Sequence, residues 1–159
     1  MIDAVIAAQS ADVVALVLAR LTRAGRPHIL AGDLNALHPG DAPGAPPEGE
    51  RLRSVARTAD GQRGALAAFL AARYVDCYRA EQPRAGGYTF RTSHTWLRLD
   101  YILASPGQTS RLMAAGVADG ARAAEASDHF PVWAEFDVQV WAGPGDGQGN
   151  PAGKMGRDL

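Results

Sequence analysis

The sequence contains only one cysteine, Cys77, among its 159 residues. One thiol cannot form an internal disulfide framework, and it excludes a zinc site that takes several thiolates from this chain. Long apolar runs are also missing, because the stretches Val13–Ala19 and Gly64–Ala72 are interrupted well short of the roughly 18 residues that a membrane-spanning helix needs. We therefore expect no membrane span, and we expect Cys77 to be a buried core residue.

The chain has no excess of basic charge, because 16 lysines and arginines stand against 17 aspartates and glutamates, for a net charge of −1. Strong non-specific binding to nucleic acid needs a basic surface, so charge by itself favours no polyanionic partner. The first residues also lack the basic stretch of a secretory signal, and they carry acids at Asp3 and Asp12. We expect a cytoplasmic protein with one domain, since the length suits one domain and not two.

The first half of the chain is typical of an α/β fold. Apolar residues at helical spacing predict an amphipathic helix over 2–23, and the apolar run Pro27–Ala31, closed by Gly32, predicts a buried strand. Residues 37–61 are rich in proline, glycine and charge, so we expect a long loop that is functional or mobile. A second helix over 63–73 and a short strand over 74–78 are predicted to follow.

The second half of the chain is richer in strands. Gly86-Gly87 predicts a turn, and three strands are predicted after it, over residues 97–104, 113–117 and 131–138. The last of these alternates apolar residues with larger or polar ones, as a strand covered unequally on its two faces does. The glycine-rich residues 143–159 have almost no large apolar side chains, which predicts a disordered tail beyond one folded unit over 1–142.

Three short segments place acids and amides next to apolar strands, where open α/β sheets carry their sites. In the first segment Gly32 permits a turn, and Asp33 and Asn35 are two residues apart, so both point to the same side of an extended chain. Such a pair suits a hard cation or a nucleophilic water, with the amide donating to a developing anion. The simpler interpretation is an Asx-rich turn that only ends the strand.

The second segment places Asp100 inside an apolar strand, where a carboxylate needs a partner. One candidate is a nearby arginine, Arg98 or Arg91. The other is the imidazole of a catalytic histidine, which the acid would orient and stabilise as imidazolium. On the residues by themselves both remain open.

The third segment, Ser127–Pro131, carries Asp128 and His129 just before the last predicted strand. Asp128 suits a metal or water contact, and His129 suits proton transfer, because histidine titrates near neutral pH. The alternative is a surface turn in which Ser127 and Asp128 cap the backbone.

Taken together, the three segments resemble the motifs of the endonuclease/exonuclease/phosphatase superfamily. The chain reads GDLN at 32–35, RLDYILAS at 98–105 and SDHFPV at 127–132. The flanking segments Val75-Asp76 and Tyr88-Thr89-Phe90 also look like the family, and the resemblance covers about 9–136. It implies an α/β (α+β) fold that forms part of a DNase I-like two-sheet β-sandwich flanked by helices.

The same resemblance implies metal-dependent hydrolysis of a phosphodiester or phosphomonoester. Asp33 would hold or deprotonate the attacking water, and Asn35 would bind the phosphate or its oxyanion. Asp100 would pair with His129, which would contact the scissile phosphate. Asp33 and Asp128 would lie on the metal side, and these oxygen ligands suit Mg²⁺ or Mn²⁺.

Further residues extend this implied site. Arg91 and His94 lie in the loop before the second motif and are candidates to bind substrate, with a solvated loop as the alternative. We expect structural roles for His28 and His38. The motifs leave the substrate open among DNA, RNA, inositol phosphates and lipid head groups, so a nucleic acid is one candidate partner.

The chain also departs from the family pattern. Family members begin with an N-terminal half that supplies an early asparagine and a metal-binding glutamate, and no such half precedes GDLN in this sequence. Three hypotheses follow: a truncated phosphoesterase with weak or no activity by itself, a non-catalytic module that binds a partner or forms a homo-oligomer, and a minimal hydrolase with a rearranged metal site. We favour the first, because the acids, the amide and the histidine of the motifs are retained while the glutamate is absent.

Overall fold

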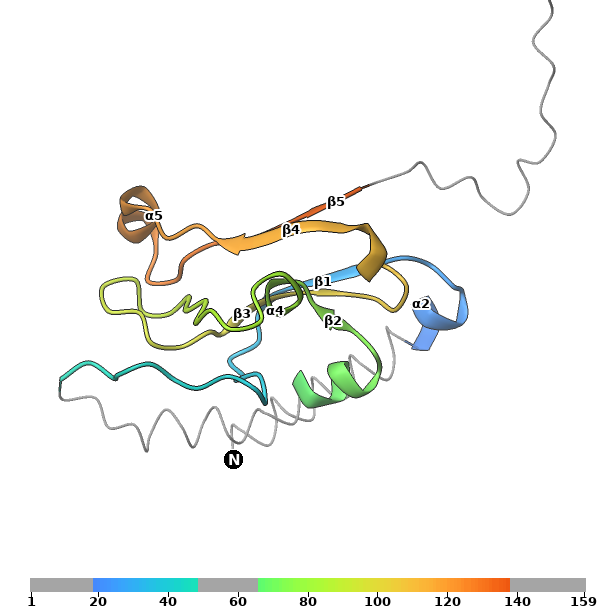
Figure 1. The fold of residues 1–159 in the computed structure, drawn as a ribbon, viewed down its shortest axis with the longest axis horizontal. Coiled ribbons are helices and arrows are strands. Elements are labelled where there is room, and N and C mark those ends of the chain that lie inside the picture. The colour runs from blue at the N-terminus through green and yellow to red at the C-terminus, as the bar shows by residue number, and fades with distance from the viewer. Residues whose placement is uncertain (1–18, 49–65, 138–159) are drawn as a thin grey trace, which may run out of the picture.

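The computed structural model describes residues 19–48 and 66–137. Its strands form two antiparallel sheets, one with the order β1-β3-β2 and one with the order β4-β5 (Figure 1). The strands are β1 (Ile29–Asp33), β2 (Val75–Asp76), β3 (Asp100–Ala104), β4 (Leu112–Val117) and β5 (Val132–Phe136). The helices are α2 (Ala19–Arg23), a helix over 66–71, α4 (Cys77–Glu81), the 3-10 turn η2 (Thr109–Arg111) and α5 (Ala121–Ala126).

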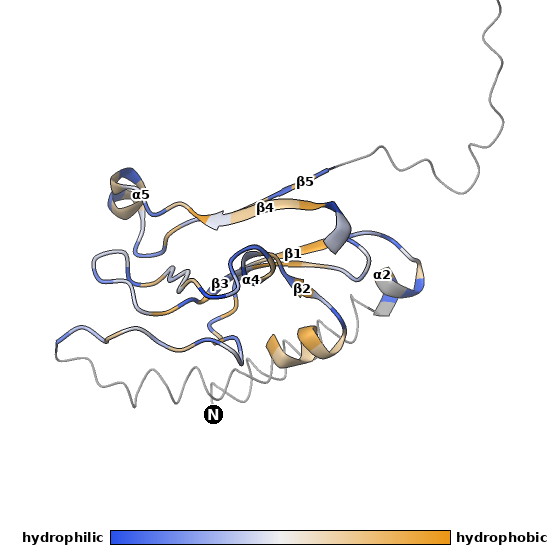
Figure 2. Ribbon diagram, viewed as in Figure 1, coloured by the Kyte–Doolittle hydropathy of each residue, from blue (hydrophilic) through white to orange (hydrophobic). Residues whose placement is uncertain are grey.

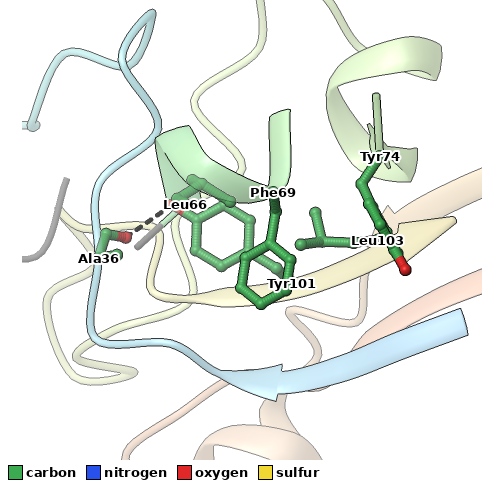
Figure 3. Packing of buried hydrophobic residues seen from close by; sticks show 6 residues of the cluster. All are labelled: Ala36, Leu66, Phe69, Tyr74, Tyr101 and Leu103. Atoms are coloured by element: carbon green, nitrogen blue, oxygen red, sulfur yellow. Dashed lines mark hydrogen bonds between the residues drawn. The ribbon is translucent and has the colours of Figure 1, made fainter. Parts of the chain in front are cut away.

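Strand β3 is central in the larger sheet, and its two faces carry two different cores. Tyr101 and Leu103 point to one face and pack with Leu66 and Phe69 of helix 66–71 (Figure 3). Ile102 and Ala104 belong to a second cluster that contains residues of β4 and β5. Because successive side chains of a strand point to opposite faces, β3 is the layer between helix 66–71 and the β4-β5 sheet.

The hydropathy pattern follows these layers. Figure 2 shows hydrophobic residues along helix 66–71, β1 and β4, whereas α5 is mixed and many of the hydrophilic residues lie in the loops and in β5. The second core cluster contains Cys77, whose side chain is fully buried, as the sequence predicts. Burial raises the pKa of the Cys77 thiol to about 11, with the Asp76 carboxylate adding to the effect.

A buried ion network fixes the loop that follows β1. Arg98 is 1% exposed, and its guanidinium lies 2.8 Å (Nε) from an Asp41 carboxylate oxygen and 2.7 Å (Nη2) from one of Asp76. Arg79 Nη2 lies 2.5 Å from the other oxygen of Asp41. Charge-assisted contacts of this kind satisfy buried charges that would otherwise be costly. The network therefore connects the loop that contains Asp41 to β2 and α4.

Several predicted elements need correction. The predicted strand over 74–78 is wrong in its second half, because β2 ends at Asp76, where helix α4 begins. The Asp76 side chain accepts a hydrogen bond of 3.2 Å from the Arg79 amide and so caps that helix. The predicted buried strand after Pro27 is shifted and exposed: β1 is an outer strand of its sheet, and Ile29 is 48% exposed.

The later strands agree more closely with the prediction. The strand predicted over 97–104 begins only at Asp100, because Leu97 pairs with Phe90 in an isolated bridge instead. Strands β4 and β5 lie within one or two residues of the predicted ranges, and β5 alternates half-buried and exposed residues.

Other predictions fall largely or wholly outside the described residues. These are the helix over 2–23 apart from its last turn, the part of the 37–61 loop that follows residue 48, the start of the helix over 63–73, and the tail over 143–159. Among the helices that the structure does describe, none is long and apolar enough to cross a membrane.

Candidate active site

The pairing of β1 with β3 brings two of the predicted acids together. Asp33, the last residue of β1, lies directly opposite Asp100, the first residue of β3. The chain then turns, because Asn35 adopts a left-handed conformation with φ of 48°. Its backbone N–H donates a 2.8 Å hydrogen bond to Asp33 Oδ1. The predicted extended spacing of Asp33 and Asn35 is therefore replaced by an Asx-type turn at the strand end.

The Tyr101 hydroxyl holds the chain just after that turn. It donates a 2.7 Å hydrogen bond to the Ala36 carbonyl oxygen and accepts one of 3.0 Å from the His38 backbone N–H. Burial raises the pKa of the Tyr101 hydroxyl far above its ordinary value. The hydroxyl therefore stays protonated and can keep donating to Ala36, which fixes the backbone next to Asn35.

The structure also settles the partner of Asp100. His129 Nδ1 lies 2.8 Å from Asp100 Oδ2, so the imidazole is the partner, while Arg98 turns to the buried aspartates instead. A bridge between Phe90 and His129 holds the backbone, and their rings lie 4.8 Å apart. The buried Thr89 hydroxyl accepts hydrogen bonds of 3.1 and 3.3 Å from the Leu99 and Asp100 amides.

The charges of this cluster affect one another. Burial raises the pKa of Asp33, and the nearby Asp100 and Asp128 carboxylates raise it further, against the opposing hydrogen bond from the Asn35 amide and the charge of His129. Burial acts to lower the pKa of His129, but the hydrogen bond and charge of Asp100 outweigh it, with help from Asp33 and Asp128, so the pKa is raised. The site therefore holds an aspartate that is a stronger base than usual beside a histidine that retains its proton more readily.

Two further predicted site residues, Asp128 and Arg91, lie near members of this cluster. Asp128 is exposed, and its charge acts on both Asp33 and His129, which places it beside the cluster. The Arg91 guanidinium lies 5.3 Å from the centre of the Phe90 ring, the same ring that contacts His129.

The three other histidines, His28, His38 and His94, contact groups outside the Asp100–His129 pair. The His94 ring is 3.1 Å from the Ala45 carbonyl oxygen, in contact with the loop after β1. His28 contacts the Tyr74 hydroxyl, and His38 lies 3.7 Å from Asp41. These contacts agree with structural roles for His28 and His38.

Two residues that support the site were not singled out by sequence reasoning. Thr89 and Phe90 belong to a flanking Tyr-Thr-Phe segment, yet the Thr89 hydroxyl accepts a hydrogen bond from the Asp100 amide and the Phe90 ring contacts the His129 ring at a tilt of 46°. The position of that segment just before the second motif was the available signal. The Asp41 link to Arg98 spans 57 positions of sequence, and no local pattern marks it.

The donor set is chemically suited to a hard cation but is incomplete as a metal centre. Asp33 and Asp128 offer carboxylate oxygens, which Mg²⁺ and Mn²⁺ prefer. Within residues 19–48 and 66–137, however, no three histidine, cysteine or acidic side chains gather in a way that would hold a metal ion. Asp33 and Asp128 are therefore the residues of the described chain that would contribute oxygen ligands to such a site.

Comparison with known proteins agrees with this geometry. The family model described as "Endonuclease/Exonuclease/phosphatase family" matches residues 2–129. The chain belongs to this family. Comparison with curated proteins finds no match. The acid, amide and histidine motifs thus stand in a chain that has both the sequence and the DNase I-like fold of the family.

Three solved structures illustrate the likeness. A 3'-5' exonuclease from Neisseria meningitidis is 30% identical, with a TM-score of 0.63, over 81% of this chain and 52% of that one. A 3' phosphatase from Neisseria bound to a product DNA hairpin is 29% identical, with a TM-score of 0.62 and the same coverage. An AP endonuclease from Archaeoglobus fulgidus is 27% identical, with a TM-score of 0.54, over 72% of this chain and 47% of that one. The chain thus spans about half the length of these structures.

Proposed function

We propose that this chain carries the catalytic acid–histidine portion of a metal-dependent phosphoesterase that acts on DNA. The observation that supports this proposal most is the 2.8 Å hydrogen bond between His129 and Asp100, next to an Asp33 whose pKa is raised by burial. Family membership supports hydrolysis of a phosphoester as the reaction class. The matched structures carry the names of a 3'-5' exonuclease, a 3' phosphatase bound to DNA and an AP endonuclease, which favours a DNA phosphoester as substrate.

Each residue has a role that its surroundings can support. Asp33 holds or deprotonates the water that attacks phosphorus, and in the metal-free site burial raises its pKa, which favours the role of base. Asp100 orients His129 through Nδ1, which leaves Nε2–H to donate to a phosphate oxygen. Asn35 and Arg91 bind the non-reacting phosphate oxygens, and Arg91 is placed for this by its contact with Phe90. A bound Mg²⁺ or Mn²⁺ would neutralise phosphate charge, with Asp33 and Asp128 as ligands from this chain.

The test is hydrolysis of a DNA hairpin with a 3' phosphate and of a DNA duplex with an internal phosphodiester, with Mg²⁺, with Mn²⁺ and with chelator. We expect turnover that requires the metal, and we expect His129→Ala to lower it by about 10² to 10⁴, the usual contribution of a positioned acid or base. Asp137→Asn, an exposed aspartate at the end of β5, is the matched control and should leave the rate unchanged. An unchanged rate in His129→Ala would refute the assignment.

A non-catalytic role is the second candidate function, and exposed apolar residues favour it. Ile29, Met113 and Trp133 are 48%, 59% and 46% exposed on β1, β4 and β5, in a chain that spans about half of its matched structures. In this case the chain would act as a binding module that covers these strands with a partner or a second copy. Two results together would favour this function. Sedimentation would show that the purified chain forms a dimer or a larger species, and its rate of hydrolysis with metal would be no higher than that of His129→Ala.

A further inference from the structure

A pocket of about 770 Å³ lies outside the candidate active site. Its walls come from helix α4, the loop at Gly86–Tyr88 and strand β4, together with Trp133 of β5. Ligand-binding pockets in proteins commonly fall between roughly 300 and 1,000 Å³. Thr92 and Phe130, which are next to Arg91 and His129 in the sequence, line the pocket, whereas Arg91 and His129 themselves do not.

Trp133 forms one aromatic wall of the pocket. It pairs across the sheet with Gly116, and a Cβ added to that glycine would lie 2.7 Å from the indole ring. The indole therefore occupies the space that a side chain at position 116 would need, beside the backbone of β4. Trp133 is 46% exposed, so part of its surface remains available to a ligand.

Two tyrosines also line the pocket, and each lies against a glycine in the same way. A Cβ on Gly87 would lie 2.2 Å from the Tyr78 ring, and a Cβ on Gly86 would lie 2.8 Å from the Tyr88 ring. The glycine pair of the loop thus makes space for two aromatic side chains that line the pocket. The arrangement resembles a partial aromatic cage, which is suited to cationic groups.

The charge of the pocket favours a ligand of the opposite charge. Glu81 and Asp119 both line it, and among the described residues no lysine, arginine or histidine does so. Two carboxylates without a cation repel the phosphates of a nucleic acid and attract a positive group. Tyr78 already has the guanidinium groups of Arg79 and Arg98 at 5.8 and 5.5 Å from its ring centre, and those cations are neutralised by buried aspartates.

The edge of β4 adds a way to hold a polypeptide. Residues 114–117 of β4 line the pocket, and in the described part of the chain β4 pairs only with β5. The opposite edge of β4 can therefore form main-chain hydrogen bonds with an extended segment. The volume of the pocket is large enough for one long side chain and its flanking backbone.

We propose that this pocket binds an arginine side chain of a partner polypeptide, with the guanidinium between the aromatic rings and the carboxylates of Glu81 and Asp119. Arginine fits better than lysine, because its planar group stacks on aromatic faces and forms paired hydrogen bonds with carboxylates. This inference is independent of the hydrolytic activity, since the pocket contains none of the residues to which that activity is assigned.

The experiment titrates the full chain with an extended pentapeptide that has arginine at its centre, and with the same peptide carrying citrulline, the neutral analogue. The readout is the NMR signal of the Trp133 indole N–H together with the Gly116 amide. We expect the arginine peptide to shift both signals and to bind at least 10-fold more tightly than the citrulline peptide. Capped arginine, without flanking residues, should bind at least 10-fold more weakly than the arginine peptide.

Variants test the origin of the selectivity. Glu81→Gln combined with Asp119→Asn should remove the preference for the arginine peptide over the citrulline peptide. Trp133→Ala should weaken the binding of both peptides. Asp137→Asn, which is exposed but does not line the pocket, should bind as the parent does. Equal binding of the two peptides, binding of adenosine in place of arginine, or equal affinity for capped arginine and the peptide would each overturn the proposal.

Discussion

Replacing Asp100 with asparagine removes one charge from the candidate active site while it keeps the shape of the side chain. The amide oxygen can still accept the hydrogen bond from His129 Nδ1, which is 2.8 Å long in the parent chain. A hydrogen bond to a charged group contributes about 1.5–3 kcal/mol, against about 0.5–1.5 kcal/mol for a neutral one. The side chains of His129 and Asp100 are 25% and 15% exposed, so solvent screens the pair only in part.

The effect depends on pH with a sign that follows from the raised pKa of His129. A histidine whose pKa is higher in the folded state stabilises the fold fully below the pKa of the unfolded residue, 6.5. That contribution is lost as the pH rises through the folded pKa. At pH 5 we expect Asp100→Asn to lower the free energy of unfolding by about 1–2 kcal/mol. At pH 9 the loss should be close to zero, because His129 is neutral and the repulsion between Asp100 and Asp33 has also been removed.

Urea unfolding of the parent and Asp100→Asn chains at pH 5 and pH 9 measures this difference. NMR titration of the His129 ring should show a lower pKa in the variant than in the parent. Asp137→Asn serves as the control for loss of one exposed negative charge. If the destabilisation were equal at the two pH values, the pair would not carry the proton that the mechanism assigns to it.

Three further expectations concern the fold. Arg98→Met should lower the free energy of unfolding by about 3–5 kcal/mol in urea, because it leaves the buried Asp76 without its cation and leaves Asp41 with Arg79 only. Gly87→Ala should lower the melting temperature more than Gly25→Ala; both glycines have positive φ, but only at Gly87 does a Cβ meet a ring, that of Tyr78, at 2.2 Å. Cys77, buried and with its pKa raised to about 11, should react with a thiol reagent only on unfolding, and reaction at the same rate in the folded chain would contradict its burial.

The accuracy of the predictions varied with the range of the interactions involved. Local alternation placed β4 and β5 to within one or two residues, because their side-chain pattern matches the two faces of a strand. The same kind of pattern predicts a strand over 74–78. The side chain of Asp76 instead caps helix α4, which begins at Cys77. The apolar pattern also predicts that the run after Pro27 is buried, although burial depends on which elements cover a strand, and β1 lies at the outside of its sheet.

The motifs identified the acids and the histidine, but the sequence left the partner of Asp100 open between an arginine and an imidazole. Arg98 is two positions away and was a reasonable candidate. The structure directs it to Asp41, 57 positions earlier, because its guanidinium is buried and needs two carboxylates. Arg98 therefore does not pair with Asp100, whose carboxylate contacts the His129 imidazole.

The sequence by itself determined the residue types of the site, the family and the alternating pattern of the last strands. These follow from short segments, in which spacing sets the direction of each side chain. Only the tertiary structure decided that β1 and β3 pair so that Asp33 meets Asp100, that the Phe90 ring contacts His129, and that the Trp133 indole lies against Gly116. Those contacts join residues far apart in the chain, and they depend on sheet register and packing, which no local pattern encodes.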